Sequence, residues 1–264
     1  MKSTIFIHIP KSGGSTMYDI ISRQYPVEQR FAVRSIKQIN NLTSLSEQQK
    51  NQIRILQGHL PFGTHRYLPH SQGTDYFTLL RSPVERVNSL YHFILEREGH
   101  YAHKEIVQNN YSLQDFVCSG LTKETDNGQL RLLGNKTNAD YGSLKVDDLA
   151  FAKAKLKEHF TVVGLTERFD ETVLLLKKQY QWKWTFYRRK NVTKSKITVS
   201  DLDESTVNSI IRYNELDIEL YNWAAQRFEQ HIASLGNKFE KELTGYRKLN
   251  RIFRQAARFS DLLR

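Results

Sequence analysis

The stretch "IFIHIPKSGGSTMYDII", Ile5 to Ile21, decides the fold. A nearly continuous apolar run from Thr4 to Ile9 predicts a buried strand of a parallel sheet. The turn "PKSGGST" follows directly, and the pattern from Ser15 to Gln24 predicts a helix. A glycine-rich turn between a strand and a helix presents backbone N–H groups and the positive helix end to an anion. The stretch therefore predicts a phosphate- or sulfate-binding site.

Each residue type in this turn has a use in anion binding. Lys11 supplies a formal charge, and the backbone from Ser12 onward supplies N–H donors. Gly13 and Gly14 allow close approach of the backbone to the anion. The side chains of the next two residues offer hydroxyl groups; these are Ser15 and Thr16. Because the lysine precedes the glycines, the turn is neither a Walker A loop nor a dinucleotide fingerprint. An ordinary tight turn that caps a helix is the alternative.

A second strand–helix unit, "DYFTLLRSPVERVNSLY", repeats the arrangement. We expect a strand from Tyr76 to Leu80 and a helix with Pro83 in its first turn. Arg81 at the strand end and Ser89, about two helical turns on, are placed to converge on a second phosphate. Taken singly, either could be a surface ion-pair partner or a cap. Two anion-binding strand ends in one sheet indicate a ligand with two separate phosphate groups.

The order of elements predicts an α/β domain with a central, mainly parallel sheet. A third strand is expected at Phe160–Leu165, again followed by a helix, and the chain from Asp201 onward reads as almost wholly helical. We expect one domain over residues 1–236 and a basic amphipathic helical tail over residues 237–264.

Composition limits the class of protein. The 264 residues include one cysteine, Cys118, so an internal disulfide and a cysteine-based metal site are excluded. The sequence has neither a secretory signal pattern nor a run of about eighteen apolar residues. With a Met directly ahead of the first strand, this predicts a cytoplasmic protein. The net charge of +11 favours a polyanionic partner but does not choose among nucleic acid, anionic lipid, acidic polysaccharide and a phosphorylated cofactor.

These motifs resemble those of a known superfamily. "FIHIPKSGGST" is similar to the 5′-phosphosulfate-binding loop of the sulfotransferases, and "RSPVERVNSLY" to their 3′-phosphate-binding segment. Further fragments resemble the carbohydrate type that includes the heparan and dermatan 2-O-sulfotransferases; they are "QGHLPFG", "DNGQLRLLGN", "VGLTERFDETVLLL", "RRKNVTKSK" and "NELDIELYNWAAQRF". The resemblance implies a P-loop-like three-layer fold. It also implies 3′-phosphoadenosine 5′-phosphosulfate (PAPS) as donor, PAP as product, a carbohydrate or glycoconjugate acceptor, and no metal.

The resemblance also selects a catalytic base. By itself, His59 in "QGHLPFG" reads as a structural histidine bonded to backbone. The 2-O-sulfotransferase group carries its catalytic histidine in a comparable Gly-His element, which implies His59 as general base with Lys11 beside the leaving group. His8, inside the first strand, is expected to be structural.

Three further sets of residues are candidates for substrate or cofactor contact. The first set is His92, Glu96, His100 and His103, of which the first three are spaced four apart and could hold a metal if the helix continued. Gly99 is expected to end the helix, and the pattern is not His-Glu-x-x-His, so substrate contact or a solvated face is favoured, with His92 as the candidate contact. In "DNGQLRLLGN", Asp126 or Asn127 reads as a helix cap. The resemblance suggests Asn127 and Arg131 near the acceptor.

A late basic loop, "YRRKNVTKSK", reads by default as a solvated surface segment. In the superfamily a late basic loop closes over the 3′-phosphate of the nucleotide. This implies a cofactor role for one or more of its basic residues, with Arg189, Lys190 and Lys194 as the candidates.

The tail carries eight Lys/Arg against three Asp/Glu, and apolar residues recur at helical spacing. These are Phe239, Leu243, Tyr246, Leu249, Phe253 and Ala256. We expect the stripe to pack on the domain, with contact to a membrane surface or an acidic partner as the alternative.

The sequence thus favours an O-sulfotransferase that moves a sulfuryl group from PAPS to a sugar hydroxyl. A P-loop-type nucleotide kinase or NTPase is the first alternative, and the missing Walker A loop opposes it. A non-enzymatic module that binds polyanions is the second; the charge is spread along the chain, and no nucleic-acid-binding motif is present.

Overall fold

The computed structural model describes residues 3–33, 38–69, 73–190 and 198–262. Within these ranges the strands are β1 (Thr4–Ile7), β2 (Arg30–Val33), β3 (Ile55–Gly58), β4 (Asp75–Leu80) and β5 (Phe160–Leu165). The longer helices are α1 (Gly14–Ser22), α4 (Pro83–Leu95), α8 (Val146–His159), α9 (Phe169–Tyr180), α10 (Glu204–Tyr213), α11 (Glu215–Ser234) and α12 (Gly236–Leu262). The shorter ones are α2 (Ile39–Thr43), α3 (Glu47–Gln52), α5 (His103–Gln108), α6 (Leu113–Cys118) and α7 (Gly128–Leu133).

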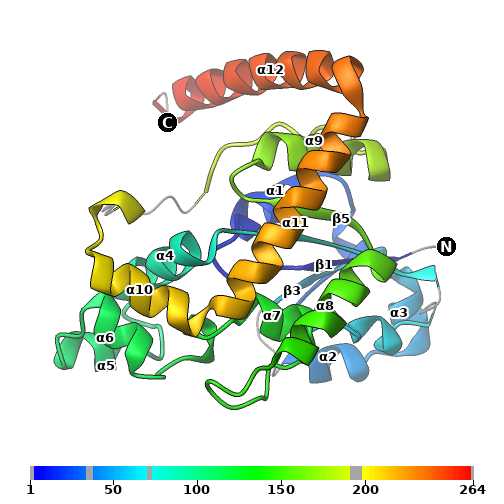
Figure 1. Cartoon of the computed structure of the whole chain (residues 1–264). Helices are drawn as coiled ribbons and strands as arrows, with labels where there is room; N and C mark the ends of the chain where they lie inside the picture. The colour runs from blue at the N-terminus through cyan, green and yellow to red at the C-terminus, as the bar shows by residue number, and fades with distance from the viewer. Residues whose placement is uncertain (1–2, 34–37, 70–72, 191–197, 263–264) are drawn as a thin grey trace.

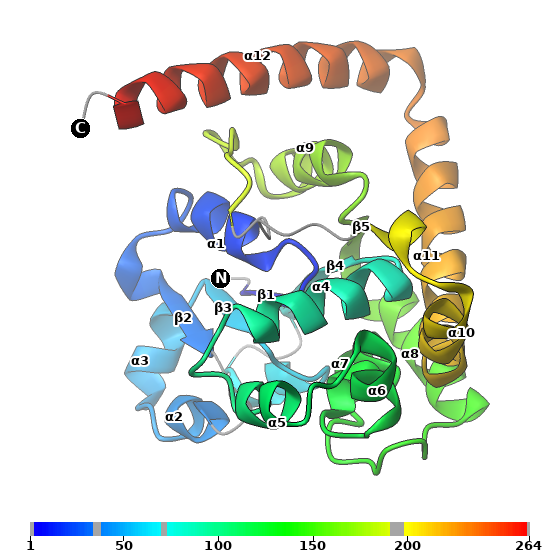
Figure 2. The ribbon, with the colours of Figure 1, turned by 90° about the vertical axis from the view of Figure 1, so that its left-hand side faces the viewer.

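The strands form one sheet in the order β2-β3-β1-β4-β5, and every neighbouring pair in it is parallel. Parallel strands need helical crossovers, so helices cover both faces of the sheet. α1 and α9 lie on one side of it and α7 and α8 on the other (Figures 1 and 2). Because both faces are covered, every residue of β1, β3 and β4 is buried. The expected α/β class with a parallel sheet is therefore confirmed.

The elements expected from the second unit are also found. β4 leads into α4 with Pro83 at the first helical position, and β5 leads into α9. Strand β2 was not expected from the sequence, because "RFAV" contains a charge. In the structure only Val33 of its residues is buried. It lies at the edge of the sheet, where one neighbour is enough to hold a short strand.

The main core joins the sheet to helices from the whole chain, including α11 and α12. A second, smaller core lies between α4, α5, α6 and α10, around Val87, Ile94, Phe116 and Ile210. No helix in the described ranges combines the length and the apolar character needed to cross a bilayer.

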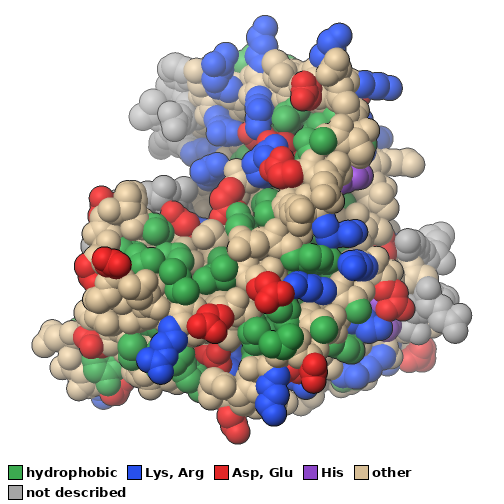
Figure 3. Space-filling view, in the orientation of Figure 1, with side chains coloured by type: hydrophobic (Ala, Val, Ile, Leu, Met, Phe, Trp, Pro, Cys, Tyr) green, Lys and Arg blue, Asp and Glu red, His purple; other side chains and the backbone are tan. Residues whose placement is uncertain are grey.

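The tail is one long helix, α12, which runs beside α9 at the outer edge of the molecule (Figure 1). Its buried face consists of Phe239, Leu243 and Tyr246. The prediction that the apolar stripe continues to the end of the tail is wrong, because Leu249 and Phe253 are exposed. The buried residue in that part of the helix is Asn250. Lys and Arg side chains gather over this helix in the space-filling view (Figure 3).

Helix α7 is capped by a residue distant in sequence. Asn127 precedes it in a left-handed conformation, φ 47°, and makes no side-chain cap. The carboxylate of Asp217 on α11 instead accepts hydrogen bonds from the N–H groups of Gln129 (3.0 Å) and Leu130 (2.8 Å). Asp217 is fully buried and lies 4.0 Å from the buried guanidinium of Arg86. The expected cap at Asp126 or Asn127 is therefore wrong, and the cap ties α11 to α7.

Asp217→Asn should destabilise the protein by about 3 kcal/mol, because it removes the carboxylate that stands beside a buried guanidinium. Urea unfolding followed by circular dichroism measures this. Glu219→Gln on the same helix is the control: Glu219 is 60% exposed in its pair with Lys153, so its loss should cost at most about 0.5 kcal/mol. Equal effects of the two substitutions would contradict the assigned role of Asp217.

Candidate functional site

A cavity of about 1020 Å³ opens at the carboxyl ends of β1, β3 and β4. The parallel register aligns Ile7 with Gly58 on one side and with Thr78 on the other, so the segments that follow these strands meet at one edge. The structure brings most of the expected site residues into its lining. They are Lys11, Gly13, Gly14, Ser15, Thr16, His59, Arg81, Ser89, His92, Arg131, Arg189 and Lys190.

The turn after β1 has the backbone of an anion site. Lys11 (φ 68°) and Gly13 (φ 77°) are both left-handed, which turns the chain sharply into α1 at Gly14. The first hydrogen bond of the helix runs from Met17 N to Gly13 O at 3.1 Å. The N–H groups ahead of Met17 have no acceptor within the helix, and the helix dipole adds positive potential there. Ser12 differs from the expectation: it does not line the cavity, and its N–H donates to Ile9 O.

His8 packs directly on this turn. A Cβ on Gly14 would lie 1.8 Å from Nε2 of His8, so only glycine leaves room for the imidazole. Its Nδ1 is 3.1 Å from the Tyr18 hydroxyl one helical turn further on. Burial lowers the pKa of His8 well below its usual range, and the nearby His59 and Lys11 lower it further. His8 is therefore a neutral ring fixed between the turn and the rest of the site.

His59 follows β3 and is oriented by His8. Its Nδ1 lies 2.9 Å from the carbonyl oxygen of His8, and the two rings stack with centroids 4.5 Å apart. A carbonyl can only accept, so Nδ1 of His59 carries the proton. Nε2 of the neutral ring then holds a free lone pair, which a general base requires.

Arg81 links the two strand-end segments. One of its terminal nitrogens donates to the carbonyl of Lys11 (3.0 Å), and the other pairs with Glu85 (3.0 Å). Its backbone N–H and C=O are both bonded to the side-chain amide of Gln129, at 3.0 and 2.9 Å. Arg81 and the turn after β1 thus form one connected unit, although 70 residues separate Arg81 from Lys11.

Lys11 stands in a mixed electrostatic environment. Its ammonium group lies 3.9 Å from the centre of the Phe93 ring. Burial lowers the pKa of Lys11 to about 8; Arg81 adds to the lowering, and Glu124 opposes it. An anion bound at the turn would favour the charged form.

The late basic segment reaches the turn through its backbone. The N–H of Lys190 donates to the Thr16 hydroxyl (3.1 Å), and the Lys190 ammonium pairs with Asp19 (2.6 Å). Tyr187 is buried just before it and is held by Asn250 of α12, whose Oδ1 accepts from the Tyr187 N–H at 2.9 Å. Lys194 lies outside the described residues.

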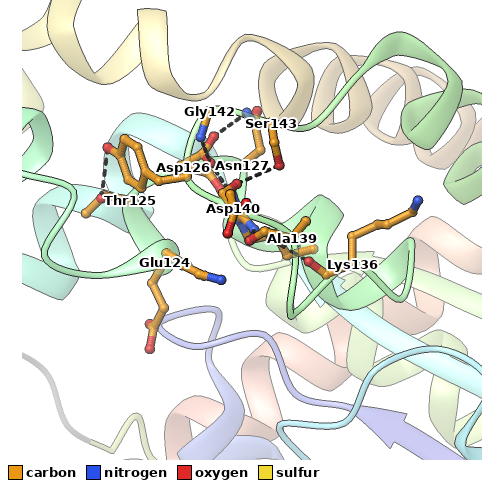
Figure 4. A network of polar contacts seen from close by, with 12 residues as sticks. Glu124, Thr125, Asp126, Asn127, Lys136, Ala139, Asp140, Gly142 and Ser143 are labelled. Carbon is orange, nitrogen blue, oxygen red and sulfur yellow. Dashed lines mark hydrogen bonds and ion pairs between the residues drawn. The ribbon is translucent and has the colours of Figure 1, made fainter.

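Asn127 and Arg131 are both engaged in polar contacts with other parts of the protein. Figure 4 shows Asn127 beside Asp126, with the loop residues Ala139, Asp140 and Gly142 close by. The guanidinium of Arg131 binds the Asp126 carboxylate and also the carbonyls of Ala139 (2.7 Å) and Asp140 (2.8 Å). Asn127 does not line the cavity, and its amide bonds Asp126 and the N–H of Asp217. These contacts give both residues a structural role.

Several lining residues were not anticipated, namely His8, Tyr18, Phe93, Tyr101 and Glu124. His8 was set aside because it belongs to a buried run, while Tyr101 and Glu124 lie in short segments with no periodic pattern. In the described part of the chain, no three His, Cys, Asp or Glu side chains come together as a metal site. Helix α4 ends at Leu95, so His92 and His100 do not share a helix.

The chain is similar in sequence to known proteins of one family. The chain matches the sequence model of the family Galactose-3-O-sulfotransferase over residues 7–260. It is 26% identical over 195 residues to galactose-3-O-sulfotransferase 3 of Bos taurus. That alignment covers 69% of this chain and 44% of the relative, so the chain spans less than half the length of the curated relative. The solved structure of mouse sulfotransferase SULT7A1 complexed with PAP is similar with a TM-score of 0.41 and 14% identity, covering 78% of this chain and 63% of that one.

The family match confirms the sulfotransferase superfamily that the sequence motifs resembled. It names a different carbohydrate group within that superfamily, because the motifs had resembled the 2-O-sulfotransferases.

Gly14→Ala should both destabilise the protein and displace the His8–His59 pair, because the new methyl group would overlap the His8 ring. We expect a loss of about 1–3 kcal/mol, the usual cost of overpacking, in thermal and urea unfolding. The ring signals of His8 and His59 should move in the NMR spectrum.

Gly245→Ala is the matched control, because a Cβ there meets nothing within 4 Å in helix α12. It should stabilise the protein by about 0.5–1 kcal/mol. If Gly14→Ala also stabilised the protein, the close contact between His8 and the turn would be refuted.

Proposed function

The chain belongs to the galactose-3-O-sulfotransferase family, and from this premise we propose that it transfers the sulfuryl group of PAPS to a hydroxyl of a galactose-containing carbohydrate. One observation supports this most strongly. The glycine-rich turn after β1, Arg81 at the end of β4 and a histidine whose neutral ring carries its lone pair on Nε2 line a single cavity. PAPS has two separated phosphate groups, and sulfuryl transfer needs a base beside the sulfur.

The donor would bind along the edge of the sheet. The backbone of Gly13 to Thr16 and the ammonium of Lys11 would hold the 5′-phosphosulfate. Arg81 and Ser89, both in the cavity lining, would hold the 3′-phosphate, with Arg189 and Lys190 beside them. No metal is required, because these groups supply the positive charge.

In the reaction, the acceptor hydroxyl oxygen attacks the sulfur in line with the leaving phosphate. The new oxygen–sulfur bond forms as the bond from sulfur to the 5′-phosphate oxygen breaks, and PAP leaves with the extra negative charge. Nε2 of His59 takes the hydroxyl proton. Lys11 and the N–H groups of α1 stabilise the charge that develops on the leaving oxygen.

Isothermal titration calorimetry with PAP tests the donor site and its pH dependence. We expect binding without magnesium that is at least tenfold tighter than binding of ATP or AMP. Below pH 8 Lys11 is charged in the free protein, so affinity should be full. Above this pH, binding must take up a proton, and affinity should fall by up to about tenfold per pH unit.

Lys11→Arg is the control, because arginine stays charged over this range. Its PAP affinity should not fall between pH 8 and 10. Equal binding of ATP and PAP would remove the donor assignment, and a flat pH profile of the unmodified protein would exclude Lys11 as the titrating contact.

His59→Ala should lower sulfuryl transfer by about 10²- to 10⁴-fold, the usual contribution of a general base. PAP affinity should stay within about threefold, because the donor contacts lie on other segments. Transfer is followed with radiolabelled PAPS and a galactoside. His231→Ala, at an exposed position of α11, is the matched control and should be active. A collapse of donor affinity in His59→Ala would show that His59 is a nucleotide contact or a structural residue.

A further inference from the structure

Glu124 is a carboxylate that the donor chemistry does not use. It lines the cavity from the short 3₁₀ helix Lys123–Thr125, and its backbone carbonyl accepts from Arg86 at 2.5 Å. Its Oε2 is buried and has no hydrogen-bond partner among the described residues. Figure 4 shows the Glu124 side chain turned away from Asp126 and the loop residues around it.

The surroundings of Glu124 define what could bind it. Burial lowers the pKa of Lys11, Arg86 and His100, and the charge of Glu124 opposes the lowering in each case, so Glu124 stands near all three. A buried carboxylate oxygen without a donor is costly unless a ligand supplies one. The phosphates of a donor nucleotide cannot, because they are acceptors of the same charge. A neutral ligand with hydroxyl groups can.

Two neighbouring side chains, His100 and Tyr101, also suit a neutral ligand with hydroxyl groups. The N–H of Ala102 donates to Nδ1 of His100 (3.2 Å), so neutral His100 carries its proton on Nε2 and can donate it to a ligand oxygen. The Tyr101 ring stacks on His100 with centroids 4.6 Å apart and is 68% exposed. An exposed aromatic face suits the apolar C–H face of a sugar ring.

The cavity is large for a single small ligand. Its volume of about 1020 Å³ lies just above the range of about 300–1,000 Å³ found for pockets that hold one drug-sized molecule. The nucleotide contacts assigned above come from the turn after β1, from Arg81 and from the late basic segment. Glu124, His100 and Tyr101 belong to other segments and line a part of the cavity that is available to the acceptor.

We propose that Glu124, His100 and Tyr101 form the acceptor subsite, and that it takes an uncharged pyranoside. The Glu124 carboxylate accepts a hydrogen bond from a sugar hydroxyl other than the one that is sulfated, His100 donates to a ring substituent, and Tyr101 stacks on the ring. This rests on the proposed function and deepens it. Because Glu124 is negative, the subsite also selects against sugars that carry a carboxylate at that position.

The test compares Glu124→Gln with Glu96→Gln. Glu96 is exposed, does not line the cavity and also raises the pKa of Lys11, so its variant reproduces the long-range charge change without the contact. Methyl β-D-galactopyranoside is titrated into each protein saturated with PAP, and transfer from PAPS to the same galactoside is measured. Glu124→Gln should weaken galactoside binding and raise KM by about 10- to 100-fold, and Glu96→Gln by less than about twofold. Both variants should bind PAP at least as tightly as the unmodified protein.

Monodeoxy galactosides sharpen the test. In the unmodified protein, one non-reacting hydroxyl should cost about tenfold or more in kcat/KM when it is removed. In Glu124→Gln the same removal should cost less than about twofold, because the partner carboxylate is gone. Tyr101→Ala should weaken galactoside binding, while Tyr101→Phe, which keeps the ring, should not.

The outcomes separate the two proposals. If the unmodified protein fails to bind PAP, the proposed function falls. If it binds PAP and transfers sulfate but Glu124→Gln behaves as Glu96→Gln, the acceptor subsite is refuted and the function stands. Loss of PAP binding in Glu124→Gln would place Glu124 on the donor side, and absence of galactoside binding to the PAP-saturated protein would also overturn the subsite.

Discussion

The contact between the His8 imidazole and the backbone at Gly14 is the constraint on which the site depends. The ring leaves no room for a side chain there, and Tyr18 and His59 hold it in place from two other sides. Because the His8 carbonyl also receives the Nδ1–H of His59, one strand end fixes both the start of α1 and the tautomer of His59. The turn after β1 and the His59 ring are therefore held in fixed positions by a neutral, buried ring.

The charges around the turn after β1 favour an anionic ligand. Burial lowers the pKa of Lys11 to about 8, and the nearby positive charge of Arg81 adds to the lowering. Glu85 pairs with Arg81 at 3.0 Å and Glu124 offsets part of the remaining charge. A bound phosphate or sulfate would relieve the repulsion between the cations, which favours binding where the positive charges are already assembled.

The C-terminal helices are part of the site's framework. Asp217 on α11 caps α7, and Gln129 in the first turn of α7 holds the backbone of Arg81 with its side-chain amide. Asn250 on α12 holds the backbone of Tyr187, ahead of the segment that reaches Thr16 through Lys190. Basic side chains cover the outer side of α12 (Figure 3), while its inner face is buried through Tyr246.

The sequence by itself determined the parallel α/β fold and placed the glycine-rich turn with Lys11 and also Arg81 at strand ends, because strand–turn–helix patterns and their glycine, lysine and arginine residues are local signals. It also placed His59 at the strand-end edge, through its resemblance to a known motif. The tertiary structure decided what depends on distant partners. Asp217 caps α7 in place of the expected local residue, and Arg131 binds Asp126 beside a loop. The edge strand β2 is held by its pairing with β3, because its sequence has no apolar pattern. The sequence also could not show the tautomer of His59, or that Oε2 of Glu124 lacks a hydrogen-bond partner among the described residues. Each depends on which atoms from remote segments come within hydrogen-bonding distance.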